Sequence, residues 1–164
     1  MRNGSAKKIA LSGLLAAMAG VIMGMGGLIP VATYVCPVLC MVLCCFVLRI
    51  CGRRYGWTWY VAVSILALVI GPDKEAAAVY LFLGYYPMIK SGFEKLPLAF
   101  VFKFLYFNVA TIALYGLLIF VMGLNELYGE IFGDGFWGMA LLLLLGNVTF
   151  FLLDRVLTRF LSKR

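Results

Sequence analysis

The sequence predicts an all-α polytopic membrane protein, in which residues 1–164 form one bundle of six transmembrane helices with cytoplasmic N- and C-termini. The first observation behind this prediction is composition: 65% of the 164 residues are apolar, and the mean hydropathy is +1.04. Since one crossing needs roughly 20 apolar residues, six crossings nearly exhaust the chain and leave no room for a soluble domain. The predicted crossings are Ile9–Ile29, Thr33–Leu48, Tyr55–Ile70, Glu75–Ile89, Leu98–Met122 and Phe136–Leu153.

The second observation is how the charges are sorted between the ends of these segments. Basic residues gather at the two termini and in the second and fourth connections: Arg2, Lys7, Lys8, Arg49, Arg53, Arg54, Lys90, Lys95, Lys103, Arg155, Arg159, Lys163 and Arg164. Acids gather in the third and fifth connections: Asp73, Glu75, Glu126, Glu130 and Asp134. Lysine and arginine stay on the cytoplasmic side, so both termini are predicted to be inside. The net charge of +7 then reflects topology and anionic lipid, and nucleic-acid binding is not predicted.

Glycine and proline mark the ends of the segments in order, as expected at helix boundaries. These boundaries are Gly26–Pro30, Gly52–Gly56, Gly71–Asp73, Ser91–Pro97 and Gly133–Gly135. The first segment follows Lys7 and Lys8 as a signal peptide would, but its apolar run is too long and no cleavage site follows, so a retained helix is predicted.

The third and fourth segments are short, with about 15 residues each, or about 22 Å of helix against a hydrocarbon core of about 30 Å. Two alternatives follow. The pair could leave a dent that is open to the outside. They could instead belong to longer helices whose ends carry interfacial aromatic residues, namely Trp57, Trp59, Tyr85 and Tyr86.

Three of the five cysteines, Cys36, Cys40 and Cys44, are four residues apart and therefore share one helix face. Thiolates favour soft metals such as copper(I) or zinc, but ligands on successive turns of one helix cannot converge on one ion. Without any histidine to help, these cysteines are interpreted as small packing residues. No cofactor and no metal site is predicted.

The first segment carries a small-residue stripe, repeating at steps of four and three residues: Ala6, Ala10, Gly13, Ala17, Gly20, Gly24 and Gly27. In lipid, small side chains let two helix backbones approach closely. The stripe therefore serves either packing inside the bundle or docking of another membrane subunit. Its end near Lys7 and Lys8, comprising Ala6, Ala10, Gly13 and Ala17, is the predicted docking part.

The outer turn between the third and fourth segments is the predicted solute-binding region. Lys74 is the only basic residue on the outer side, between Asp73 and Glu75 at a helix start. Lys74 and the helix amides could hold a carboxylate or phosphate, while the two acids could hold an amine. The alternative is capping, with Asp73 as N-cap, Glu75 in the first turn and Lys74 in water.

Other polar and aromatic residues predicted in the outer half or near mid-membrane complete the candidate solute site: Tyr34, Tyr80, Tyr115, Asn125, Trp137 and Asn147. Asn108 and Asn147 lie about ten residues inside their segments, where amides usually bond across helices. No enzyme is predicted, because histidine-dependent sites and a Walker motif are missing from the sequence. No ionisable residue is expected in mid-membrane, which argues against a proton-coupled pump.

The opening residues AKKIALSGLLAAMA, from Ala6 to Ala19, resemble the start of the substrate-binding S components of energy-coupling factor (ECF) transporters, which import micronutrients into bacteria. PDKEAA from Pro72 and GYYP from Gly84 resemble an uncharacterised subgroup of these proteins. The resemblance implies a subunit of the bacterial plasma membrane that captures a vitamin-like solute from outside. It also implies docking, through an A-x-x-x-A pattern, on a membrane scaffold subunit that two cytoplasmic ATPases drive.

Two rivals remain at this stage. A structural membrane scaffold of the cell-shape type would need no outer pocket, and a closed outer half would favour it. A stand-alone facilitator would move solute without ATPase partners.

Overall fold

The computed structural model describes residues 2–28, 32–95, 97–120, 123, 129 and 136–162. Within these ranges the secondary structure is helical and contains no strand. Four of the described helices are long and apolar enough to cross a bilayer, so the chain is a membrane protein: Ser5–Gly24, Ala32–Ile50, Ala99–Phe120 and Trp137–Leu161. The chain divides into two compact units, which are described separately: unit 1 is Met1–Ser91 with Leu157–Arg164, and unit 2 is Gly92–Val156.

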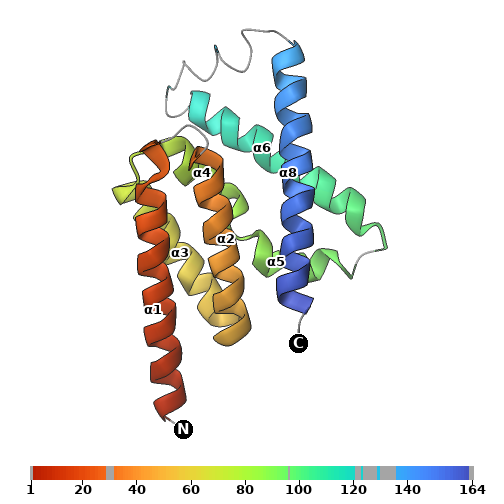
Figure 1. Cartoon of the computed structure of the whole chain (residues 1–164). Coiled ribbons are helices and arrows are strands. Elements are labelled where there is room, and N and C mark those ends of the chain that lie inside the picture. The colour runs from red at the N-terminus through yellow and green to blue at the C-terminus, as the bar shows by residue number, and fades with distance from the viewer. Residues whose placement is uncertain are drawn as a thin grey trace. The chain divides into compact units, whose positions relative to one another are not determined.

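Unit 1 is built around α2 and α3 (Figure 1). Its helices are α1 (Arg2–Gly24), η1 (Gly26–Leu28), α2 (Ala32–Ile50), α3 (Arg53–Ile70), α4 (Lys74–Leu83) and α5 (Tyr86–Phe93). Helix α1 contacts α2 and α3, and both of these contact α4. Gly52 joins α2 to α3 with φ at +99°, a backbone conformation that side-chain-bearing residues rarely adopt.

The cysteine face of α2 lies in the interior of unit 1. Cys36, Cys40 and Cys44 are buried free thiols, and Cys40 Sγ lies 3.7 Å from the carbonyl oxygen of Ala19 in α1. This arrangement agrees with the packing interpretation, because small side chains bring α1 close to α2.

The fourth predicted crossing, Glu75–Ile89, is not one helix. Helix α4 ends at Leu83, a turn follows at Gly84 and Tyr85, and α5 begins at Tyr86. Pro87 explains the break, because it has no N–H to bond the carbonyl of Leu83. The ten residues of α4 rise only about 15 Å. Tyr60 donates a hydrogen bond to the carbonyl of Leu81 at 2.5 Å, satisfying one of the acceptors at the helix end.

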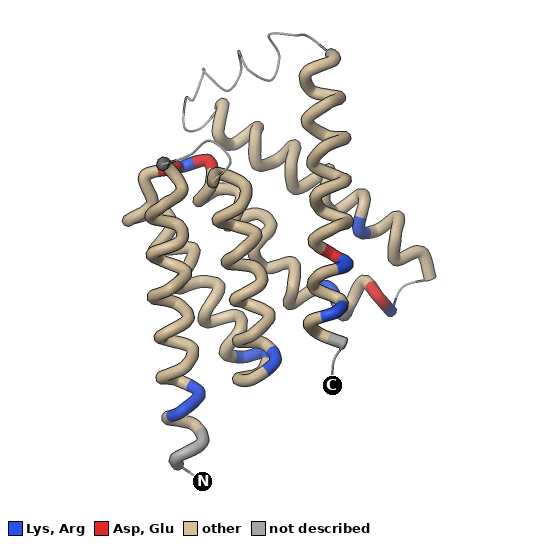
Figure 2. Tube along the Cα trace, in the orientation of Figure 1, with Lys and Arg blue, Asp and Glu red and all other residues tan. Residues whose placement is uncertain are grey.

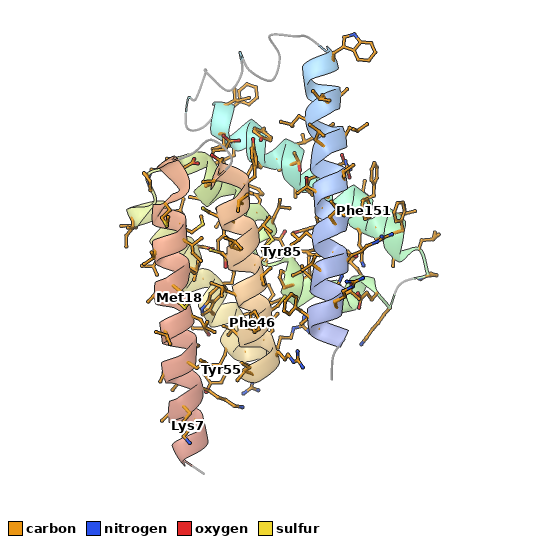
Figure 3. The ribbon with its side chains drawn as sticks, in the orientation of Figure 1. Lys7, Met18, Phe46, Tyr55, Tyr85 and Phe151 are labelled. Atoms are coloured by element: carbon orange, nitrogen blue, oxygen red, sulfur yellow. The ribbon has the colours of Figure 1, made fainter. Side chains whose placement is uncertain are left out.

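The charges of unit 1 separate to opposite ends of its helices (Figure 2). Basic residues lie at the first turns of α1 and at the junction of α2 and α3, where Figure 3 shows Lys7 and Tyr55. Asp73, Lys74 and Glu75 lie at the opposite end, where α4 begins. The charges of α1, of the α2–α3 junction and of the start of α4 therefore lie at the ends that the sequence predicts, whereas Lys90 of α5 is buried.

Unit 2 consists mainly of α6 (Ala99–Phe120) and the part of α8 (Phe136–Ser162) up to Val156. The two helices cross (Figure 1) and meet through aromatic side chains. Phe107 stacks on Phe150 with ring centroids 4.8 Å apart, and a Cβ at Gly146 would lie 3.0 Å from the Phe107 ring. Helix α8 continues beyond the predicted end at Leu153, so Asp154 and Arg155 are helical.

Candidate functional site

The part of the small-residue stripe near the start of α1 is open. Ala6, Ala10, Gly13 and Ala17 are all exposed, and a Cβ built at Gly13 would meet no atom within 4 Å. In the membrane-spanning part of α1, only 11% of the most apolar stretch is buried, against 39% in α2. Helix α1 is therefore a peripheral helix of unit 1. This part of the stripe therefore lies on the surface of unit 1, where no other described helix covers it.

At the other end of the stripe, Gly20 and Gly27 pack within the chain, whereas a Cβ at Gly24 would meet nothing within 4 Å. A Cβ at Gly20 would lie 3.9 Å from Leu66, and one at Gly27 would lie 3.2 Å from Pro72. Internal packing therefore applies to Gly20 and Gly27, while Gly13 and its exposed neighbours are uncovered.

Asp73 caps α4. Its Oδ1 accepts a hydrogen bond from the backbone N–H of Ala76 at 3.1 Å, and its Oδ2 accepts one from Thr33 Oγ1 at 2.7 Å. Nearby, Tyr34 donates its hydroxyl hydrogen to Glu75 Oε1 at 2.9 Å. The side chains of Asp73 and Glu75 therefore tie α4 to the start of α2.

Lys74 extends its ammonium group back to α3. Its Nζ donates to the carbonyl oxygens of Leu68 at 2.8 Å and Gly71 at 3.2 Å. A cation at this position satisfies the open acceptors of a helix C-terminus and complements its partial negative charge. The capping alternative left Lys74 in water. Lys74 is indeed exposed, and it also bonds the C-terminal end of α3, with one of its three ammonium hydrogens unused by these bonds.

Tyr80 lies inside unit 1, away from the outer turn. It is fully buried, its ring centroid is 5.8 Å from that of Tyr60, and its hydroxyl has no hydrogen-bond partner within the part of the chain that the structure describes. Trp59 Nε1 is also buried without a hydrogen-bond partner among the described residues. Sequence reasoning placed Tyr80 at a solute site but did not distinguish it from Tyr34, which is exposed.

The remaining predicted solute residues belong to unit 2 or lie outside the described residues. Trp137 is 79% exposed at the start of α8, and Tyr115 in α6 is half-buried. Asn125 lies outside the described residues. Within unit 1, the structure thus groups Tyr34 with Asp73, Lys74 and Glu75.

Asn147 pairs with Asn108, as expected for amides inside two membrane helices. Each Nδ2 donates to the other residue's Oδ1 at 3.2 Å. The second hydrogen of each Nδ2 goes to a carbonyl one turn earlier, Phe104 at 2.8 Å or Leu143 at 2.7 Å. The pair satisfies its donors internally and links α6 to α8.

A buried ion pair in unit 2 escaped the sequence analysis. Lys103 Nζ donates to Asp154 Oδ2 at 2.9 Å and lies 3.8 Å from Glu94 Oε1. Lys103 had been assigned to a cytoplasmic connection, but it lies inside α6. A signal was present in the sequence: Glu94 and Asp154 are the two acids that depart from the charge sorting, and both approach the same lysine.

No family model, curated protein or solved structure matches the chain. Its function is therefore argued from its own residues.

Proposed function

We propose that the chain is the solute-binding S component of an ECF-type importer in a bacterial plasma membrane. In this proposal α3 and the α4–α5 pair complete six crossings, and both termini are cytoplasmic. The observation that carries the proposal is the uncovered face of α1 formed by Ala6, Ala10, Gly13 and Ala17.

The chemistry of this face suits a helix of another subunit. Lipid tails are as apolar as leucine, so helices associate in a bilayer where their backbones can approach closely. A row of alanine and glycine allows that approach. The face lies on the end of α1 that carries Lys7 and Lys8, which the charge rule places at the cytoplasm. A scaffold driven by two cytoplasmic ATPases would be reached from this side.

The opposite end of unit 1 is the proposed solute-binding end. Tyr34, Asp73, Lys74 and Glu75 place a cation beside two carboxylates there. The ammonium hydrogen that Lys74 does not use on α3 is available for the carboxylate of a small vitamin-like solute.

One observation favours the structural scaffold instead. The contacts of Thr33 with Asp73 and of Tyr34 with Glu75 close the outer turn with internal hydrogen bonds. A scaffold would keep this turn closed and would bind neither a solute nor ATPase subunits.

Docking can be tested by affinity purification of the tagged chain from its native host, with mass spectrometry of the co-purified proteins. We expect a membrane subunit and two Walker-motif ATPases with the wild type, and their loss in Gly13→Trp. The matched control is Leu14→Trp, the neighbouring position on α1, where a large side chain is already 61% exposed. Retention of the ATPases by Gly13→Trp, or their loss in Leu14→Trp as well, would contradict docking through the stripe.

A further inference from the structure

A groove of about 820 Å³ lies between α6 and α8 in unit 2. Its lining is mostly apolar and includes Phe104, Leu144, Val148, Phe151, Leu152 and Arg155. Phe151, labelled in Figure 3, stacks on Phe100 of α6 with ring centroids 4.7 Å apart and closes one stretch of the wall. Leu144, Val148 and Leu152 are each more than half exposed, so the groove is open along α8.

The groove follows one face of α8 from Met139 to Arg155. Arg155 and Asn147 are eight residues apart, or about 12 Å along the helix. One leaflet of a bilayer offers about 15 Å of hydrocarbon, half of the whole core. An acyl chain whose headgroup lies level with Arg155 would therefore reach the neighbourhood of the Asn108–Asn147 pair.

The two asparagines in the groove have no amide hydrogen left to donate to a polar solute. Asn108 and Asn147 line it, but both donate all their amide hydrogens to each other and to their own helices. A polar solute would have to displace these bonds, whereas an acyl chain leaves them intact and covers the apolar wall.

Arg155 supplies the charge at one end. It is exposed and forms no hydrogen bond or ion pair with the residues that the structure describes. The carboxylate of its neighbour Asp154 is engaged by Lys103 at 2.9 Å, so the nearest negative charge is already compensated. An exposed guanidinium beside an apolar groove complements a phosphate that carries acyl chains.

We propose that this groove binds one anionic phospholipid of the surrounding bilayer, with its phosphate at Arg155 and an acyl chain along Phe151, Val148 and Leu144. The site is independent of the importer proposal, since it requires neither a solute nor a partner subunit.

The proposal is tested by native mass spectrometry of the full chain, released from nanodiscs that contain equal amounts of phosphatidylglycerol and phosphatidylcholine with identical acyl chains. We expect one retained lipid, enriched in phosphatidylglycerol about fivefold, since one arginine near a membrane surface contributes about that factor toward an anionic lipid. Arg155→Gln should bring the ratio of the two lipids to about one. Arg159→Gln, which removes an exposed charge of α8 outside the groove, should leave the enrichment unchanged.

A second pair of variants tests the apolar part of the groove. Val148→Trp should fill it and reduce the retained lipid. Leu141→Trp, on an exposed α8 position that does not line the groove, should not. Equal retention of the two lipids by the wild type, an equal effect of Arg155→Gln and Arg159→Gln, or full lipid retention by Val148→Trp would overturn the proposal.

Discussion

Asn108 and Asn147 show how two residues join the helices of unit 2. Changing either one to leucine leaves the other amide without its partner inside the membrane, and we expect each single variant to lose about 1 kcal/mol of unfolding free energy. The double variant should be more stable than the sum of the two single effects predicts, because it leaves no amide unpaired. Denaturant titration in mild detergent measures this coupling. Strict additivity would show that the 3.2 Å contacts contribute nothing.

The ion pair of Lys103 and Asp154 should contribute more to the unfolding free energy than the asparagine pair does. Lys103→Met leaves a carboxylate buried without its cation, and we expect a loss of about 3 kcal/mol, at the low end for a broken buried pair. Lys103→Met with Asp154→Leu should recover most of this loss. Glu94→Gln, at a side chain that is 44% exposed and 3.8 Å from Lys103, should change stability by less than about 1 kcal/mol. An equal effect of Glu94→Gln would place the important partner of Lys103 elsewhere.

The asparagine pair could be predicted, because an amide deep inside a membrane segment has no water to bond and usually bonds across to another helix. The ion pair was missed, because Lys103 was counted as a cytoplasmic flanking charge although it lay within the predicted segment Leu98–Met122, and because α8 extends past its predicted end at Leu153. The burial of Tyr80 could not be predicted either, because it depends on the packing of α4 against α2 and α3, which no local pattern encodes.

At the scale of the element, variants at the start of α4 test how much its capping residues stabilise the fold. Asp73→Ala removes the N-cap, and we expect a loss of about 1 kcal/mol of unfolding free energy. Lys74→Met should have a smaller effect, because the ammonium group is exposed. Thermal unfolding of the purified protein in detergent checks both. If neither variant changes stability, the hydrogen bonds of Asp73 and Lys74 are not what holds this turn.

The ends of α2 and α3 lie within two residues of the predicted ones, because glycine and proline interrupt the helical hydrogen bonds near them. Helix α1 was predicted less well, since it begins at Arg2 and ends at Gly24. The break between α4 and α5 was missed, since Gly84 and Pro87 lie inside an apolar run that reads as one crossing. The true end of α8 was missed because a charged residue was taken as the end of the helix, whereas Asp154 is compensated by Lys103 and the helix continues.

At the scale of the whole molecule, the charge sorting predicted membrane topology and is visible within unit 1 as opposite charged ends (Figure 2). Apolar composition likewise predicted membrane character, which four described helices have by length and hydropathy. Six crossings do not follow from these four. α3 begins with two arginines, and α4 is too short to cross alone, so their membrane placement depends on neighbouring helices.

The central claim is that the chain binds a small solute, and native mass spectrometry of the protein purified from its native membrane tests it most directly. The importer account predicts a bound small molecule, distinct in mass from any phospholipid, that is released on denaturation. This molecule should be retained by Gly13→Trp and lost in Lys74→Met. A protein that carries lipid alone in repeated preparations, or a small molecule bound equally by Lys74→Met, would contradict the account.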